Sequence, residues 1–286
     1  MCRLFGFRSV IRSQVHRSLV RAENALGVQS AHHPDGWGVA YYLGGAPHLI
    51  KSAAAAIHDG LFQRVSGVVA AETVVAHIRK ATQGTLSPLN AHPFQHGTWI
   101  FAHNGNLTEF ADNRAELVDR IDPSLRRYIL GETDSEVLFY LLLTHMEARH
   151  PLHARDYPLD SLLDAIRETV HDVASVCGPW SSNADGPPTD TYLTFIVTNG
   201  QLMVGHQGGK RLFYSTWKHR CGERDTCPSF GTSCEAMSQT GVVNHLVLTS
   251  EPLHGENVWL PLQAGQMVAV DARMRLRTVG GIQPVI

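Results

Sequence analysis

The most informative residue for chemistry is a cysteine at the second position of the chain, Cys2. Removal of Met1 would leave this cysteine with both a thiol and a free α-amine. Because an α-amino group has a pKa of about 7.7–8.0, it can act near neutral pH as the base for its own thiol. A charged ammonium nearby also favours the thiolate, which is the reactive form. Cys2 would then unite nucleophile and base, as in enzymes that pair a threonine with its own amine.

Side chains suited to binding a substrate occur in three later segments. Arg79 directly follows a predicted buried strand, where its guanidinium could hold a carboxylate through two hydrogen bonds. Asn104 and Gly105 end another apolar run, and a side-chain amide beside a backbone N–H suits an oxyanion hole, worth about 2.7–4 kcal/mol per donor. Asp134, at a predicted helix start, could accept hydrogen bonds from a substrate ammonium group. Each also has a structural interpretation: Arg79 as a surface charge, Asn104-Gly105 as a hairpin turn and Asp134 as a helix cap.

In this order, the four positions lie in segments that together resemble the class II glutamine amidotransferases. The segments are residues 1–6, 33–38, 77–84, 92–94, 103–107 and 133–136, with a looser match at 248–253. The resemblance implies an α+β fold, the four-layer αββα sandwich of the N-terminal-nucleophile hydrolases. It is strongest to the stand-alone branch that includes the bacterial YafJ-type proteins and the γ-glutamyl amidohydrolases of the ergothioneine and glutathione pathways.

The resemblance also implies a role for each residue. Cys2 is the nucleophile and its freed amine the base, while Asn104 and the backbone N–H of Gly105 form the oxyanion hole. Arg79 binds the α-carboxylate of the glutaminyl group and Asp134 its α-ammonium. Attack on the γ-amide would release ammonia or another amine and leave a γ-glutamyl thioester for water to resolve.

Parts of the chain depart from the nucleotide- and hexosamine-forming synthases of this family. Lys80 stands where those synthases usually carry an aromatic residue, and Gln83 replaces their usual histidine. The remaining sequence lacks an isomerase or phosphoribosyltransferase domain and a dinucleotide pattern, and residues 208–210, Gly-Gly-Lys, do not complete a P-loop. The resemblance implies a small-molecule substrate, glutamine or a γ-glutamyl compound. Any ammonia-accepting synthase would be a separate protein.

Three alternatives stay open. Free glutamine could be a poor substrate and a larger γ-glutamyl peptide or conjugate the true one. The chain could instead be a non-catalytic partner subunit that binds glutamine, although the complete residue set favours an enzyme. An N-terminal-cysteine acylase of the bile-salt or penicillin type would share the layered fold, but Arg79 and Asp134 together favour an amino-acid head group.

Regular hydrophobic patterns predict the elements that must position these residues. Strands are predicted at 5–10, 37–43, 74–78, 99–102, 192–197, 202–206, 212–217, 243–249 and 267–270, and helices at 16–26, 134–146 and 159–173. Gly27 is a plausible stop for the first helix, and Thr133 or Asp134 an N-cap for the second. Residues 177–190 are a loop by composition, and 218–241 a long surface excursion. Strands at both ends with helices between predict one layered domain over residues 1–286.

Composition excludes other classes of function. The chain has 286 residues, 43% hydrophobic and 17% charged, with a net charge of -2, so nothing drives it electrostatically toward nucleic acids or anionic membranes. It has no apolar run of about 18 residues and no signal-peptide pattern, which favours a cytoplasmic protein. The three cysteines Cys221, Cys227 and Cys234 are spaced more widely than structural zinc ligands. We predict neither a metal nor a cofactor.

Overall fold

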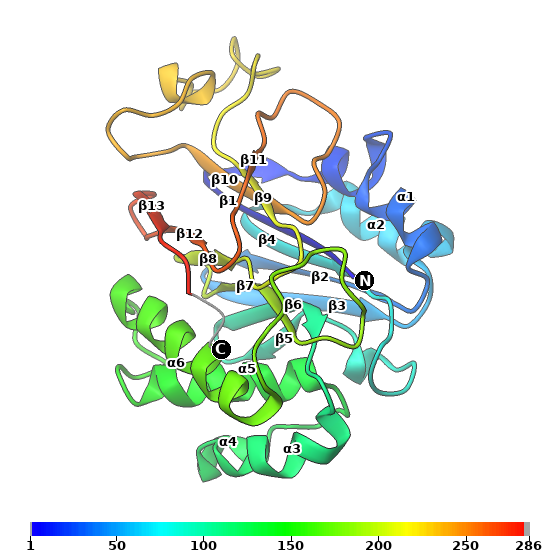
Figure 1. The fold of residues 1–286 in the computed structure, drawn as a ribbon. Coiled ribbons are helices and arrows are strands. Elements are labelled where there is room, and N and C mark those ends of the chain that lie inside the picture. Colours follow the sequence, from blue (N-terminus) through cyan, green and yellow to red (C-terminus); the bar gives the residue numbers. More distant parts are fainter. Residues whose placement is uncertain (1, 283–286) are drawn as a thin grey trace.

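The computed structural model describes residues 2–282, which form two antiparallel sheets packed face to face with helices on both outer faces (Figure 1). The strands of the first sheet are β11 (Leu260–Pro261), β9 (Phe213–Ser215), β10 (His245–Thr249), β1 (Arg3–Gln14), β4 (Ala70–Ile78), β2 (Trp37–Leu43) and β3 (Ala46–Ser52), in that order. Strand β1 therefore lies in the middle of the sheet, hydrogen-bonded to β4 on one side and to β10 on the other.

The second sheet contains six strands from the middle and the end of the chain. Their order is β13 (Leu276–Val279), β12 (Met267–Val270), β8 (Met203–His206), β7 (Tyr192–Thr198), β6 (Trp99–Asn106) and β5 (Phe94–His96). The first sheet thus combines early and late strands, and the second combines strands from the middle and the end of the chain.

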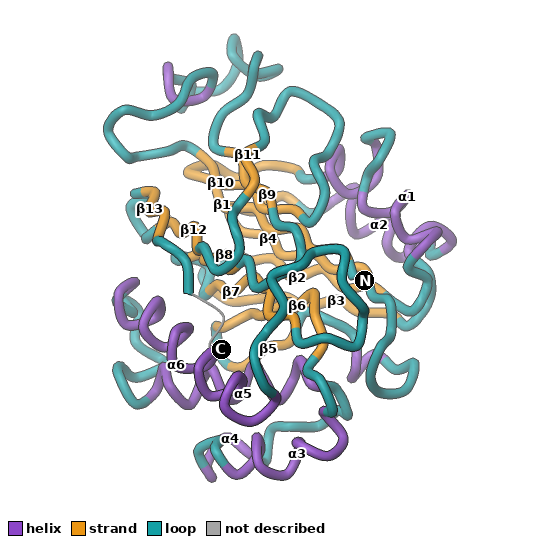
Figure 2. Tube along the Cα trace, viewed as in Figure 1, coloured by secondary structure: helices purple, strands orange, loops and turns teal. Residues whose placement is uncertain are grey.

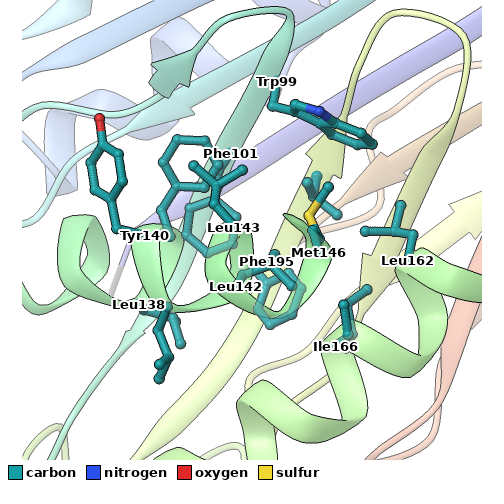
Figure 3. Packing of buried hydrophobic residues seen from close by; sticks show 14 of the residues in the cluster. Trp99, Phe101, Leu138, Tyr140, Leu142, Leu143, Met146, Leu162, Ile166 and Phe195 are labelled. Carbon is teal, nitrogen blue, oxygen red and sulfur yellow. The ribbon is translucent and has the colours of Figure 1, made fainter. Parts of the chain in front are cut away.

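Helices cover the two outer faces and complete four layers. The helices are α1 (Leu26–Gln29) and α2 (Gly60–Val68) over the first sheet, and α3 (Phe110–Asp119), α4 (Pro123–Arg126), α5 (Asp134–Glu147) and α6 (Leu159–Cys177) over the second. Three separate clusters of buried side chains fill the three interfaces between layers. In one of them α5 and α6 pack Leu142, Met146 and Ile166 against Phe101 and Phe195 of the second sheet (Figure 3). The predicted four-layer αββα sandwich is confirmed.

Most of the predicted elements are present, but the first helix was predicted wrongly. Instead of one helix over 16–26, a short π-helical turn spans Arg17–Arg21 and α1 starts only at Leu26. Between them Asn24 donates a hydrogen bond to the Pro252 carbonyl and accepts one from the His254 amide, which holds this segment in a non-helical path. Gly27 consequently lies inside α1 and does not end a helix.

The structure also differs from the prediction in the length of one strand and in several elements that were not predicted. Strand β6 continues through Asn106, so Asn104 and Gly105 lie within a strand and do not form a hairpin turn. The sequence patterns missed β3, whose side chains alternate only weakly in polarity, and the helices α2 and α3. The excursion at 218–241 is confirmed as irregular chain with a single 3-10 turn at Thr232–Cys234 (Figure 2). Within residues 2–282, no helix combines the length and the apolar character needed to cross a membrane.

Candidate active site

Side-chain alternation in four neighbouring strands brings polar residues to one end of the space between the sheets. The inward-facing core residues nearest that end are Leu4, Val75, Ala102 and Leu248. Two positions closer to the end, and therefore on the same face, come Cys2, His77, Asn104 and Ser250. Arg79 follows His77 by two further positions. The strands that build the central core thus also gather most of the predicted site residues.

The Cys2 thiol is buried against the chain that leaves β4. Its Sγ lies 3.3 Å from the amide nitrogen and 3.4 Å from the carbonyl oxygen of Lys80. Burial raises the pKa of the Cys2 thiol, the Lys80 amide and the Arg79 guanidinium act to lower it, and the Asp134 carboxylate raises it. Burial is the largest of these effects, so the pKa of the Cys2 thiol lies above its ordinary value.

Arg79 is a buried residue, only 3% exposed, and not the surface charge that the sequence left open. Its guanidinium donates hydrogen bonds to the carbonyls of Gln83 (2.7 Å), Gly84 (3.4 Å) and Thr85 (3.1 Å). Since a guanidinium has five N–H donors, these three bonds leave two for a ligand. Burial lowers the pKa of Arg79, while the nearby Cys2, Asp35 and Asp134 oppose that shift.

The turn at residues 33–36 fixes the backbone around Arg79. The Arg79 amide donates to the Gly36 carbonyl at 2.8 Å, and the Arg79 carbonyl accepts from the Asp35 amide at 3.2 Å. The Asp35 carboxylate then accepts from the amide of Ala81 at 2.8 Å. This turn therefore positions the guanidinium from outside the site.

Asn104 and Gly105 present two N–H groups at the end of β6. Asn104 is buried, its Nδ2 lies 3.5 Å from Ser250 Oγ, and its Oδ1 is without a hydrogen-bond partner in the described chain. The residue that pairs with Gly105 on β7 is Leu193, whose amide and carbonyl both bond toward β8. In an antiparallel ladder the N–H of Gly105 must then point away from β7. Strand β5 pairs only with residues 99–101, so this N–H has no partner among the strands of residues 2–282.

Only glycine fits at position 105. A Cβ there would lie 2.0 Å from the Tyr192 carbonyl oxygen and 2.1 Å from His103 Nε2, which itself donates to that oxygen at 2.8 Å. The hydrogen bond between His103 and Tyr192 passes directly beneath the Gly105 Cα. This close approach, and not a positive φ, explains the glycine.

Asp134 is the first residue of α5, and Thr133 is the N-cap, its hydroxyl accepting from the Glu136 amide. One Asp134 oxygen accepts from the Leu107 amide at 2.9 Å, just beyond β6, and the other from the Ser135 amide at 2.8 Å and hydroxyl at 3.2 Å. The positive end of the helix dipole favours a carboxylate at this position. A carboxylate offers about four acceptor sites, so capacity remains for a ligand.

Residues 1–278 match the family described as class-II glutamine amidotransferases. The chain belongs to this family. Among its relatives, the putative glutamine amidotransferase YafJ of Escherichia coli is 30% identical over 274 residues, which cover 93% of this chain and 96% of YafJ. The probable glutamine amidotransferase DUG3 of Saccharomyces cerevisiae is 28% identical over 225 residues. The chain spans only 62% of DUG3, and 45% of an uncharacterized Methanocaldococcus jannaschii protein that is 34% identical over 172 residues.

Two further proteins resemble this chain, one in a short stretch of sequence and the other in its fold. A gamma-glutamyl-hercynylcysteine sulfoxide hydrolase of Mycobacterium tuberculosis is 38% identical over 72 residues, which cover 25% of this chain. A glutamine aminotransferase class-II domain protein from Silicibacter pomeroyi superposes with a TM-score of 0.63 over 99% of this chain and all of its own, at 19% identity. The latter supports the fold of a class II glutamine amidotransferase.

One residue of this amidotransferase site was missed by sequence reasoning. Ser250 Oγ accepts a hydrogen bond from the Leu4 amide at 3.0 Å and lies within 3.5 Å of Asn104 Nδ2. It thereby links the strand that begins with the cysteine to the side chain of Asn104. The loose match at residues 248–253 was the only signal, and that match gave Ser250 no role.

Three buried histidines support the amidotransferase site from within. The rings of His77 and His92 pack with centroids 4.2 Å apart, and His77 Nε2 donates to the His103 carbonyl at 3.2 Å. His103 Nδ1 lies 2.9 Å from the hydroxyl of Ser135, next to Asp134. These contacts place the three histidines behind the site residues, where they support the site.

Folding stability is expected to fall as the pH is lowered from 7 to 5, because several histidines are buried in neutral form. Burial lowers the pKa of His77 to about 3 and of His206 to about 4, and lowers the pKa of His92 well below 6.5. In the unfolded chain each imidazole takes up a proton near pH 6.5. The unfolded state therefore binds more protons below that pH, and each histidine removes about 2 kcal/mol of stability between pH 7 and 5.

Urea denaturation at the two pH values measures this loss, and His206→Asn provides the matched variant. The asparagine amide can replace His206 Nδ1 as donor to the Leu193 carbonyl, a bond of 2.8 Å, but it does not titrate. The variant should lose about 2 kcal/mol less than the parent between pH 7 and 5. Equal losses in the two proteins would contradict the assignment of His206 as a buried neutral imidazole.

Three of the remaining cysteines lie apart from this site. Cys221, Cys227 and Cys234 line a separate cavity of about 280 Å³ beside β1 and β10, and all five cysteines are free thiols. Within residues 2–282 no three His, Cys, Asp or Glu side chains are grouped as metal ligands would be.

Proposed function

We propose that this amidotransferase hydrolyses the γ-amide of glutamine or of a γ-glutamyl compound with Cys2 as its nucleophile. The observation that carries the proposal is the arrangement of Cys2, Arg79 and Asn104 at one end of the inter-sheet space, with Asp134 close enough to influence the thiol. Each of these residues supplies one function that amide hydrolysis requires.

In the proposed reaction, Cys2 loses Met1 and its free α-amine takes the proton from its Sγ. The sulfur attacks the γ-carbonyl carbon, and the negative charge that forms on the carbonyl oxygen is stabilised by Asn104 Nδ2 and the Gly105 N–H. The ammonium of Cys2 then returns the proton to the amide nitrogen, which leaves as ammonia or an amine. Water, activated by the same amine, cleaves the γ-glutamyl thioester to glutamate and regenerates the thiol.

The amino-acid end of the substrate would be held by two opposite charges. The two unused N–H donors of Arg79 suit a planar α-carboxylate, and the remaining acceptor capacity of Asp134 suits an α-ammonium. Both side chains are fixed by other hydrogen bonds, so a ligand meets a preorganised pair. We infer from this pair that the substrate carries a free amino-acid head group.

The identity of the amine that leaves separates two candidate substrates. A relative named glutamine--fructose-6-phosphate aminotransferase, from Haemophilus influenzae and 35% identical over 134 residues, matches this chain over 19% of its own length. One candidate substrate is glutamine, from which ammonia leaves. The short match to a γ-glutamyl-conjugate hydrolase supports the alternative, that the leaving group is a larger amine and free glutamine a poor substrate. A thiol nucleophile is compatible with the reducing cytoplasm, where we place the reaction.

Release of glutamate from a panel of glutamine, γ-glutamyl peptides and γ-glutamyl anilides tests the proposal. The matched variant Arg79→Lys keeps the positive charge but cannot form a bidentate pair of hydrogen bonds with a carboxylate. It should lower kcat/KM by roughly 10- to 150-fold. Binding of glutamine without any release of glutamate would favour the non-catalytic subunit. Turnover that does not depend on Arg79 would contradict the proposed head-group recognition.

A further inference from the structure

A cavity of about 410 Å³ opens beside Asn104, and ammonia alone does not need it. Its wall includes Arg3, Asn104, Lys210, Arg211, Ser250 and Glu251. A molecule the size of water occupies about 30 Å³, whereas cavities of about 300–1,000 Å³ are typical of small-molecule sites. We name this space the Asn104 cavity.

The Asn104 cavity adjoins the proposed oxyanion site but not the head-group residues. Asn104 forms part of its wall, whereas neither Arg79 nor Asp134 is among the residues that line it. A γ-carbonyl whose oxygen faces Asn104 carries the glutamyl chain on one side and the amide nitrogen on the other. With the glutamyl end at Arg79 and Asp134, the amide nitrogen and its substituent face the cavity.

The charges in the wall of the cavity favour an anionic ligand. Three cations line it against two carboxylates, Asp185 and Glu251. Arg3 pairs with Glu251 at 3.3 Å and Arg211 with Asp185 at 2.6 Å. The third cation, Lys210, has no carboxylate at ion-pair distance among residues 2–282.

Lys210 is a buried cation with unused donor capacity. It is 5% exposed, its Nζ donates to the carbonyl of Ala184 at 2.8 Å and lies 3.4 Å from that of Gly186, and it sits 3.5 Å from the centroid of the Tyr192 ring. These carbonyl contacts leave at least one ammonium N–H. Arg3 contributes a second donor, a buried Nε without a partner in the described chain. Burying a cation without a counter-charge is unfavourable unless a ligand supplies one.

The Gly-Gly-Lys run at 208–210, which is not a P-loop, has a structural purpose here. Gly209 has a φ of +101°, and a Cβ there would lie 2.0 Å from the Ser181 carbonyl oxygen. The loop at 178–191 can therefore pack directly on this turn. Together they hold Lys210 in the wall of the cavity.

We propose that the Asn104 cavity binds the leaving amine, and that Lys210 and Arg3 select amines that carry a carboxylate. The preferred substrates would then be γ-glutamyl amino acids or peptides, and not free glutamine. This inference rests on the proposed function. It adds the specificity-determining residues on the leaving-group side.

A matched pair of substrates, γ-glutamylglycine and γ-glutamylglycinamide, isolates the carboxylate, since they differ only in that group. The acid should be hydrolysed with a kcat/KM roughly 10- to 100-fold above that of the amide, because hydrogen bonds between charged groups are the strong ones. Lys210→Met and Arg3→Gln should each reduce this ratio towards one, and Lys210→Arg should largely keep it. Arg120→Gln removes a half-buried charge on the helical side and should leave the ratio unchanged.

The outcomes separate the two proposals. Glutamate release from glutamine and both dipeptides at similar kcat/KM would overturn the leaving-group inference and leave the proposed function standing. A ratio that persists in both Lys210→Met and Arg3→Gln would equally overturn it, and Arg3→Gln decides if Lys210→Met fails to fold by circular dichroism. No glutamate from any substrate would instead refute the proposed function.

Discussion

Replacing Cys2 by alanine is expected to lower glutamate release by roughly 10⁴- to 10⁶-fold, because the variant lacks the sulfur that forms the thioester. Steady-state assays on the best substrate of the panel measure the loss. Intact-mass analysis should show that the active protein lacks Met1 and that a glutamine-like electrophile, diazo-oxo-norleucine, adds once. Peptide mapping should locate the adduct at Cys2.

Cys234→Ala is the matched control for this substitution. Cys2 and Cys234 are equally buried, each 8% exposed, but Cys234 lies beside Asn244, just before β10, and lines the separate cavity of about 280 Å³. Because the two thiols are equally buried, a reagent that labels Cys2 and not Cys234 does so for a reason other than solvent exposure. An active enzyme that retains Met1, or an adduct that persists in Cys2→Ala, would contradict the role of Cys2.

Asn104→Ala is expected to lower kcat by roughly 10²- to 10³-fold with a smaller change in KM, because it removes one oxyanion donor and no head-group contact. The structure supports a larger effect on kcat than on KM, since the Asn104 side chain contacts Ser250 and not Arg79 or Asp134. Steady-state kinetics on glutamine and on γ-glutamylglycine measure both constants.

Asn113→Ala serves as the control for Asn104→Ala. The Asn113 amide donates to the Thr108 carbonyl at the start of α3, and it takes no part in the proposed site. Its kcat should stay near that of the parent. If Asn104→Ala kept kcat within threefold of the parent, the oxyanion hole would have to be formed elsewhere.

Much of the fold was predictable because alternation of polarity is a local signal. Strands β2 and β12 match their predicted bounds, and Thr133 was identified as an N-cap candidate from residue type and position. The first helix failed because bonds from Asn24 to a loop more than 200 residues away override its local helical pattern.

The site residues were predictable from motif order, but their assembly was not. Arg79 was expected just beyond a buried strand and lies there, yet its burial depends on carbonyls of the following loop and on the turn at residues 33–36. The loose match around Ser250 and the incomplete glycine pattern before Lys210 gave neither residue a role. The positions of Ser250 and Lys210 in the fold depend on which strands pair and on which loops pack together. The hydrophobic periodicity of a single segment contains no information about that pairing.

The central place of β1 has a consequence for how the protein is made. The first strand synthesised is flanked by β10, one of the last, and the amide of Leu4 bonds to Ser250, 246 positions later. Contacts of such high sequence separation form slowly, and on the ribosome they must wait until nearly the whole chain has emerged. During that interval the leading end stays accessible at an unpaired edge, so an aminopeptidase has time to trim it before the sandwich closes.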